Sequence, residues 1–452
     1  MPLNPSDQDK RSIWLPNSNG PRWNSLYPNG NAPAGYITPP PGVSGMLLAR
    51  LFNFDNVPDY TSATDMLTLG STRNNISPQN TGGLPSGWDA LYVQDEWYPQ
   101  NGYTSNHPTV EILTSNLDKT RLGTGKSYVQ YRESNSPSQT DWRSDGQLVS
   151  RLDANWGQYR KVYVEFWIRF SPNWYGLQDT DIAGWAAKFF RIGYWNGVDP
   201  TKIFSGFQGD LGPIAIMQYS HNQYGVRNDL ALRGGGNIGV NYNFGKTSGR
   251  DFSFNFGSST VGQGYGGVDP QIPDLVNGGY LINYNGTISH KQVYGDTGVW
   301  TKVGMYVEMN TAIGAPDGIL TQWINDEQFN NITDIDWIGA SIEVDANTNF
   351  AIGDTVTGLT SGQTWVVQQT HLTTGLYFVP VAGGAPTSFY LVGETVQNQN
   401  GQQATVTKIP TMSGWNYFAV GGNSDLAQYP VADLFEDWHA VDDGVILVGS
   451  AV

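Results

Sequence analysis

The chain has 452 residues, of which 39% are hydrophobic and only 14% charged, and its formal net charge is −16. Binding to a phosphate backbone depends on clustered Lys and Arg that release counterions, so we expect no nucleic-acid partner. The absence of Cys excludes disulfides and thiolate metal sites, while 55 Gly and 25 Pro indicate frequent turns. Together these features favour an all-β protein.

Residues 1–45 are rich in Pro, Asn and Gly and contain scattered aromatic side chains such as Trp14 and Trp23. We expect an extended N-terminal arm that lies on a neighbouring subunit or folds back on its own domain. Residues 1–20 contain no apolar signal-peptide segment, and no apolar run is as long as a membrane span. We therefore expect synthesis in the cytoplasm without a signal peptide, and no membrane insertion.

Residues 46–343 consist of short alternating runs separated by Gly, Asn and Asp, a pattern typical of an antiparallel sandwich. Residues 161–170, KVYVEFWIRF, place apolar side chains at every second position and aromatic or charged ones between them. Residues 302–328, KVGMYVEMNTAIGAPDGILTQWINDEQ, read as two such strands around a tight Pro-Asp-Gly turn. One face of each strand is predicted to pack in the core and the other to contact a ligand.

Over residues 344–410 the sequence pattern changes and contains an internal repeat. Residues 350–367, FAIGDTVTGLTSGQTWVV, resemble residues 389–406, FYLVGETVQNQNGQQATV, about 40 residues further along the chain. Two similar strand pairs predict a small β module. Because strand-rich sequence resumes over residues 411–452, we expect this module to be inserted in a loop of the larger domain.

Several motifs follow one another in a recognisable order: VYVEFWIRF, AAKFFRIG, the WTKVGMYVEMNT and PDGILTQWIND hairpin, and a closing DWHAVDDGVILV. This order resembles the concanavalin A-like, LamG-type jelly rolls, which include lectins and polysaccharide lyases. The resemblance covers about 46–340 and 411–452. It implies an antiparallel concanavalin-like β-sandwich with a concave face that often binds carbohydrate, and it is specific to fold rather than activity.

The Gly-Asp/Glu-Thr-Val repeat of the inserted module resembles small β modules found in tailed-phage virion proteins. This second resemblance implies a virion surface component, such as a tail fibre, tailspike or capsid-decorating protein. The expected location is then the virion. The expected partners are host-surface polysaccharide and other virion proteins, and the expected assembly is a homo-oligomer.

Paired carboxylates are one candidate for catalysis, because glycoside hydrolases of the retaining type need an acid and a nucleophile about 5 Å apart. Glu165 and Glu308 lie on the outward faces of two predicted strands and could form such a pair if those strands were neighbours. The alternative, which we favour, is that both are solvent-facing carboxylates without a catalytic role.

A second candidate follows from the resemblance to lyases, which neutralise the uronate carboxylate with Gln, Asn or Arg and remove the C5 proton with His or Tyr. In MQYSHNQYG, Tyr219 and His221 share a predicted strand face and Gln218 lies opposite. The segment departs from the lyase signature, because no Gln-x-His strand precedes an Arg-containing partner. We therefore favour a surface or turn role for His221.

Metal binding has little support, because the five His show no pair at metal-ligand spacing. No cofactor is expected, apart from a structural calcium that Asp442 or Asp443 could bind. Two adjacent Asp are also ordinary turn residues, which is the interpretation we favour.

Sugar binding requires flat aromatic faces and planar polar groups, without tuned pKa values. The outward row of the predicted strands supplies them, and the predicted carbohydrate-binding residues are Trp167, Arg169, Tyr306, Glu308 and Trp323. Our first hypothesis is a phage virion protein that binds host glycan without cleaving it. The alternatives are a lyase or hydrolase that degrades capsular polysaccharide or exopolysaccharide, and a purely structural assembly protein.

Overall fold

The computed structural model describes residues 43, 45–62, 75–76, 84–94, 109–132, 142–171, 186–195, 213–222, 225–233, 246–247, 250–251, 300–324, 326–371, 373–380, 389–425 and 437–452. These residues form antiparallel strands, together with one short 3₁₀ turn, η3 (Leu117–Lys119). The predicted all-β antiparallel sandwich is confirmed. Apart from Val43 and Gly45, the predicted arm lies outside the described residues, as does the segment 234–299 except for 246–247 and 250–251.

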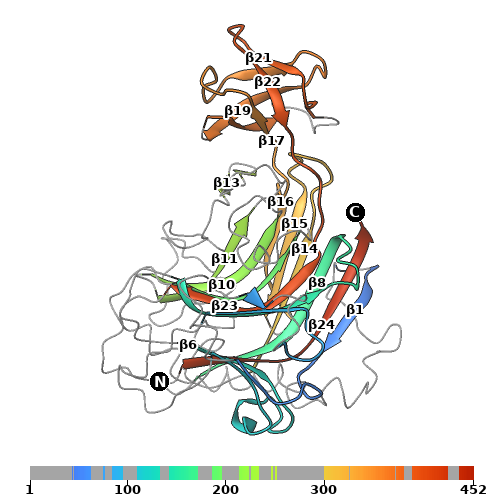
Figure 1. Cartoon of the computed structure of the whole chain (residues 1–452), viewed down its shortest axis with the longest axis vertical. Coiled ribbons are helices and arrows are strands. Elements are labelled where there is room, and N and C mark those ends of the chain that lie inside the picture. The colour runs from blue at the N-terminus through green and yellow to red at the C-terminus, as the bar shows by residue number, and fades with distance from the viewer. Residues whose placement is uncertain are drawn as a thin grey trace.

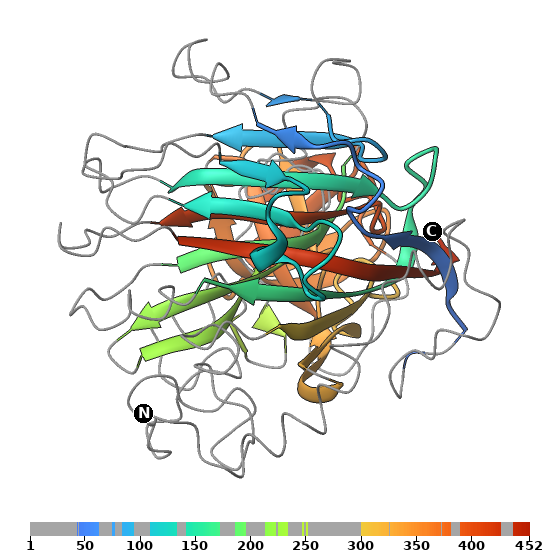
Figure 2. The ribbon, with the colours of Figure 1, turned by 90° about the horizontal axis from the view of Figure 1, so that it is seen from below.

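The first sheet has nine strands. Their order is β16 (Glu327–Ile335), β15 (Gly318–Ile324), β14 (Thr301–Glu308), β8 (Tyr159–Phe170), β24 (Asp437–Ala451), β6 (Tyr128–Arg132), β5 (Val110–Ile112) and β2 (Tyr60–Thr61), with β1 (Leu47–Phe52) paired to β24. The C-terminal strand β24 therefore lies inside the sheet, between β8 and β6 (Figure 2).

The second sheet has seven strands. Their order is β11 (Gly225–Arg233), β10 (Ile214–Asn222), β9 (Ala186–Gly193), β23 (Tyr417–Asp425), β7 (Trp142–Arg151), β4 (Ala90–Gln94) and β3 (Asn75–Ile76). A separate pair joins β12 (Lys246–Thr247) to β13 (Arg250–Asp251). In this sheet too, a strand from late in the chain, β23, lies between two early ones.

Strand alternation builds the core between the two sheets. On β8 the apolar positions at every second residue from Val162 to Phe170 all enter one cluster. The apolar positions of β14 from Val303 to Val307 enter it as well, as does Met309 just after that strand. The seven-stranded sheet contributes Leu148, Phe190 and Phe418 among others. Phe166 and Phe190 meet edge-to-face across the sheets, with ring centroids 5.0 Å apart. The alternation predicted for these two strands is therefore what joins the layers.

Six strands between β16 and β23 form a closed barrel. Its strands are β17 (Ser341–Val344), β20 (Gly375–Pro380), β19 (Thr364–His371), β18 (Thr355–Gly358), β21 (Thr395–Asn398) and β22 (Gln403–Lys408). Both repeats lie here, and their acidic residues hold equivalent turns: Asp354 accepts a hydrogen bond from the Ala351 N–H, and Glu394 accepts one from the Leu391 N–H. The barrel has its own apolar core and stands at one end of the sandwich (Figure 1).

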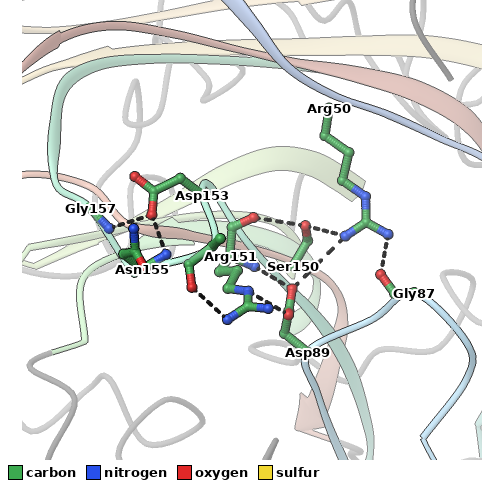
Figure 3. Close-up of polar contacts among 9 residues, drawn as sticks. Arg50, Gly87, Asp89, Ser150, Arg151, Asp153, Asn155 and Gly157 are labelled. Atoms are coloured by element: carbon green, nitrogen blue, oxygen red, sulfur yellow. Dashed lines mark hydrogen bonds and ion pairs between the residues drawn. The ribbon is translucent and has the colours of Figure 1, made fainter.

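A polar network joins the two sheets at one edge (Figure 3). Arg50 of β1 donates to the Ser150 hydroxyl of β7 over 2.6 Å and to the carbonyl of Gly87. Asp89 lies 2.8 Å from Arg151 Nε and 4.0 Å from Arg50. One carboxylate thus contacts basic side chains from both sheets, next to the turn that connects β7 to β8.

Candidate functional site

The predicted acid pair lies on two neighbouring strands, but the register separates its members. In the antiparallel pairing of β8 with β14, Glu308 lies opposite Lys161, whereas Glu165 lies opposite Gly304. Four residues of strand correspond to roughly 13 Å. Glycosidase carboxylates lie about 5 to 9.5 Å apart, so this geometry does not fit either hydrolysis mechanism.

Each of these carboxylates also has partners within the sheet. Glu165 accepts a hydrogen bond from the Tyr163 hydroxyl at 2.7 Å and lies 3.7 Å from Lys302. Glu308 accepts one from Tyr306 at 2.5 Å and lies 3.3 Å from Lys161. Burial raises the pKa of Glu165, and the charge of Lys302 opposes that rise. Both carboxylates are therefore engaged in ion pairs and hydrogen bonds within the sheet, which stabilise the pairing of β8 with β14.

The predicted sugar platforms lie on the same outer face, but their rings are covered. Trp167, Tyr306 and Trp323 are 7%, 6% and 4% exposed. The Arg121 guanidinium lies 4.9 Å from the centre of the Trp167 ring. Arg169 donates to the carbonyl of Asp118 at 2.7 Å. A sugar ring needs an open aromatic face, which these rings do not offer.

Asp442 and Asp443, the predicted calcium candidates, lie within β24 at a break in its register with β8, not in a turn before it. Asp443 pairs with Arg121 at 2.9 Å, and Asp442 accepts a hydrogen bond from the Arg121 backbone N–H. The guanidinium neutralises the charge that a cation would have neutralised. The described residues contain no cluster of three or more His, Asp or Glu side chains suited to a metal ion.

Gln218, Tyr219 and His221 lie on β10 of the seven-stranded sheet. Gln218 is opposite Lys188 of β9 and Asp229 of β11, and His221 is opposite Val226. The structure describes the backbone register of these residues and not their side chains. Their strand, β10, is followed in the sheet by β9, β23 and β7, which contribute the polar residues described next.

The outer face of the seven-stranded sheet is the face that points away from the shared core. Its apolar part is a cluster that includes Tyr92, Trp195 and Tyr417. Arg191 lies between the core residues Phe190 and Ile192, and Gln147 precedes the core residue Leu148. Alternation therefore places Arg191 and Gln147 on this outer face, and both are 1% exposed.

Tyr417 and Arg191 interact directly on this face. Tyr417 lies opposite Gly193, and Ala419 lies opposite Arg191. A Cβ on Gly193 would lie 2.5 Å from the Tyr417 hydroxyl, so the missing side chain leaves room for the phenol. Burial raises the pKa of Tyr417, whereas the charge and hydrogen bond of Arg191 act to lower it. The result is a phenol held against a guanidinium.

A bulge brings Lys188 to the same face. Phe189 and Phe190 are consecutive, yet both enter the core, and the pairing of β9 with β10 shifts at this point. Lys188 packs against Gly422, where an added Cβ would lie 2.7 Å from the Lys188 Cβ. Gln130 of the opposite sheet donates to the Gly422 carbonyl at 2.7 Å and so stabilises this irregular part of β23.

Residues 152–158 form the turn beside this face. Asp153 accepts hydrogen bonds from the N–H groups of Asn155 and Gly157 and from the Tyr159 hydroxyl, at 2.7, 2.8 and 2.8 Å. Burial acts to raise the pKa of Asp153, but these hydrogen bonds outweigh it and the pKa lies below its usual value. Trp156 projects from this turn onto the outer-face cluster.

The candidate site is therefore a set of residues that sequence reasoning did not single out: Gln147, Lys188, Arg191 and Tyr417. Lys188 and Arg191 lie in AAKFFRIG, Tyr417 lies in GWNYFAVGG, and Gln147 lies in β7. The sequence alone does not show that these strands are neighbours. Together they provide two cationic groups, an amide and a phenol on one face.

No protein-family model matches the chain, and no curated protein matches it in sequence. Among solved structures, a mutant of alginate lyase Aly36B in complex with an alginate tetrasaccharide aligns with 89% of this chain and 97% of its own, at 11% identity and a TM-score of 0.35. The PL-14 alginate lyase from Aplysia kurodai aligns with 75% of this chain and 87% of its own, at 8% identity and a TM-score of 0.32.

The alignment with the binding domain of botulinum neurotoxin serotype D covers 80% of this chain and 48% of the neurotoxin chain, at 8% identity and a TM-score of 0.22. Similarities this distant do not establish a substrate or a mechanism. Within the described residues, no helix has the length and apolar character needed to cross a membrane.

Proposed function

We propose that the outer face of the seven-stranded sheet binds an acidic, uronate-containing polysaccharide and cleaves it by β-elimination. Gln147, Arg191, Tyr417 and Lys188 are only 1% to 4% exposed, so the proposal requires that they become accessible when the glycan binds. The observation that carries this proposal is the contact between Arg191 and Tyr417, with Lys188 and Gln147 on the same face. A guanidinium binds a carboxylate through two parallel hydrogen bonds. The carboxylate is the group that distinguishes uronates from neutral sugars.

The reaction requires three tasks that these residue types can perform. Arg191, with Gln147, would neutralise the uronate carboxylate and so favour loss of the proton at C5. Tyr417, as the phenolate beside the Arg191 charge, would accept the C5 proton as the C5–H bond breaks and the C4=C5 double bond forms. The bond from C4 to the glycosidic oxygen breaks, and Tyr417 gives its proton to that leaving oxygen. No oxidant, metal or water molecule is consumed.

A second candidate function is binding of the same glycan without cleavage. The raised pKa of Tyr417 favours it, because a phenol that retains its proton is a hydrogen-bond donor rather than a base. In this case the protein would fit the predicted virion component, with the sandwich binding host-surface polysaccharide and the barrel attaching it to other virion proteins or to further copies of the chain.

Incubation of the purified protein with alginate, polygalacturonate and neutral glycans tests both candidates. The lyase proposal predicts growth of the ultraviolet absorbance of unsaturated uronates with the acidic glycans only. Retention on an immobilised polyuronate without that absorbance would support binding alone. Absence of both cleavage and retention would contradict both candidates.

A further inference from the structure

Trp156 differs from the other tryptophans of the sandwich and barrel. Among the tryptophans whose side chains the structure describes, it alone is not buried. Its ring packs edge-to-face on Trp195, with centroids 4.6 Å apart, and adjoins the cluster that contains Tyr417. The indole therefore lies beside the candidate site with part of its surface accessible.

The backbone at Trp156 is unfavourable for a bulky residue. Its φ is 56°, in the left-handed region that Gly or Asn adopts more readily. The three hydrogen bonds to Asp153 hold the turn in this conformation, and a Cβ on Gly157 would lie 2.1 Å from the Asp153 carboxylate. Strain of this kind persists where the surrounding structure enforces it, and it often occurs at binding sites.

We propose that Trp156 is a sugar-stacking platform that extends the polysaccharide site beyond Tyr417. The apolar C–H face of a pyranose ring would pack on the accessible indole surface, while neighbouring sugar carboxylates interact with Arg191 and Lys188. This inference rests on the proposed function and adds a subsite to it. The ligand class is an acidic oligosaccharide long enough to reach from Arg191 to Trp156.

Binding of alginate oligosaccharides of increasing length tests the subsite. For the wild-type protein, affinity should rise at the length that reaches Trp156. Trp156→Ala should weaken binding of the longer oligosaccharides by about tenfold and leave the shortest binding oligosaccharide unchanged. Trp323→Phe, a tryptophan truncation on the outer face of the other sheet, is the matched control and should change neither.

A third variant separates binding from stability. Trp156→Gly removes the same ring but tolerates the left-handed backbone, so it should unfold at a higher temperature than Trp156→Ala while binding as weakly. Equal affinity of wild type and Trp156→Ala for the long oligosaccharides, or an equal loss at every length, would overturn the subsite alone. A wild-type protein that binds no oligosaccharide at any length would overturn the proposed function and the subsite with it.

Discussion

The outer faces of the two sheets contain similar residue types in different arrangements. On the nine-stranded sheet, acidic side chains are paired with basic ones: Glu165 with Lys302, Glu308 with Lys161, and Asp443 with Arg121. On the seven-stranded sheet, Arg191 contacts the phenol of Tyr417, and Gln147 and Lys188 share the face. An alternating pattern identifies an outward face in either sheet, but which side chains meet on that face depends on how the strands are paired.

The largest effect is expected for the buried pair on the nine-stranded sheet. Asp443 and Arg121 side chains are 3% and 2% exposed and 2.9 Å apart. Asp443→Asn should lower the free energy of unfolding by about 3 to 5 kcal/mol, because the Arg121 charge stays buried without its counter-charge. Urea denaturation measures this. Asp118→Asn is the control: Asp118 is 71% exposed beside Lys119, and its loss should cost at most about 1 kcal/mol. Similar losses for the two variants would contradict the account.

Arg191→Lys tests whether the outer face of the seven-stranded sheet is the catalytic one. Lys keeps the charge but loses the planar pair of donors, so kcat/KM on polyuronate should fall roughly 100-fold with little change in thermal stability. Arg169→Lys makes the same change on the other sheet and should alter kcat/KM by about twofold at most. If the Arg169 variant lost as much activity as the Arg191 variant, the site would be on the wrong face.

Asp89→Asn tests the network that joins the two sheets at their edge. Asp89 accepts a hydrogen bond from the Arg151 N–H at 2.9 Å in addition to its contacts with the two guanidinium groups. Because these are charged hydrogen bonds, we expect a loss of about 2 kcal/mol of stability in thermal or urea unfolding. A change below about 0.5 kcal/mol would show that the network contributes little.

The smallest effect is a difference in pH dependence between Glu165 and Asp153. The pKa of Asp153 is lowered by folding, so its contribution is present above about pH 4 and is lost as the pH falls through the folded pKa. The pKa of Glu165 is raised, so its contribution falls as the pH rises above about 4.3 towards the folded pKa.

Stability measured against pH for wild type, Asp153→Asn and Glu165→Gln isolates these contributions. The wild-type advantage over Asp153→Asn should shrink on acidification, and that over Glu165→Gln should shrink on the alkaline side. Parallel curves for the two variants would show that these two carboxyl groups do not titrate as proposed.

Much of the fold could be predicted because it depends on local alternation. The runs that became β8 and β14 show their inward and outward faces directly, and the Pro-Asp-Gly turn between β14 and β15 fixes that hairpin. The repeat of the barrel is visible because Asp354 and Glu394 hold equivalent turns. These signals lie within one or two elements of the chain.

The candidate site could not be predicted in the same way. Arg191 and Tyr417 meet because β9 pairs with β23, and the whole barrel lies between these strands in sequence. The bulge at Phe189 also breaks the alternation, so a strict period of two would place Lys188 and Phe190 on the same face. Likewise, Glu165 and Glu308 lie on neighbouring strands, but the register of β8 and β14 keeps them apart. The sequence of a single strand does not encode that register.

Amide hydrogen exchange with and without a polyuronate oligosaccharide tests the central claim most directly. If the ligand binds the seven-stranded sheet, its addition should slow exchange in peptides from β7, β9 and β23 and in the turn at 152–158. Exchange in β8, β14 and β15 should not change. Protection confined to β8, β14 and β15 would place the ligand on the opposite sheet and contradict the account.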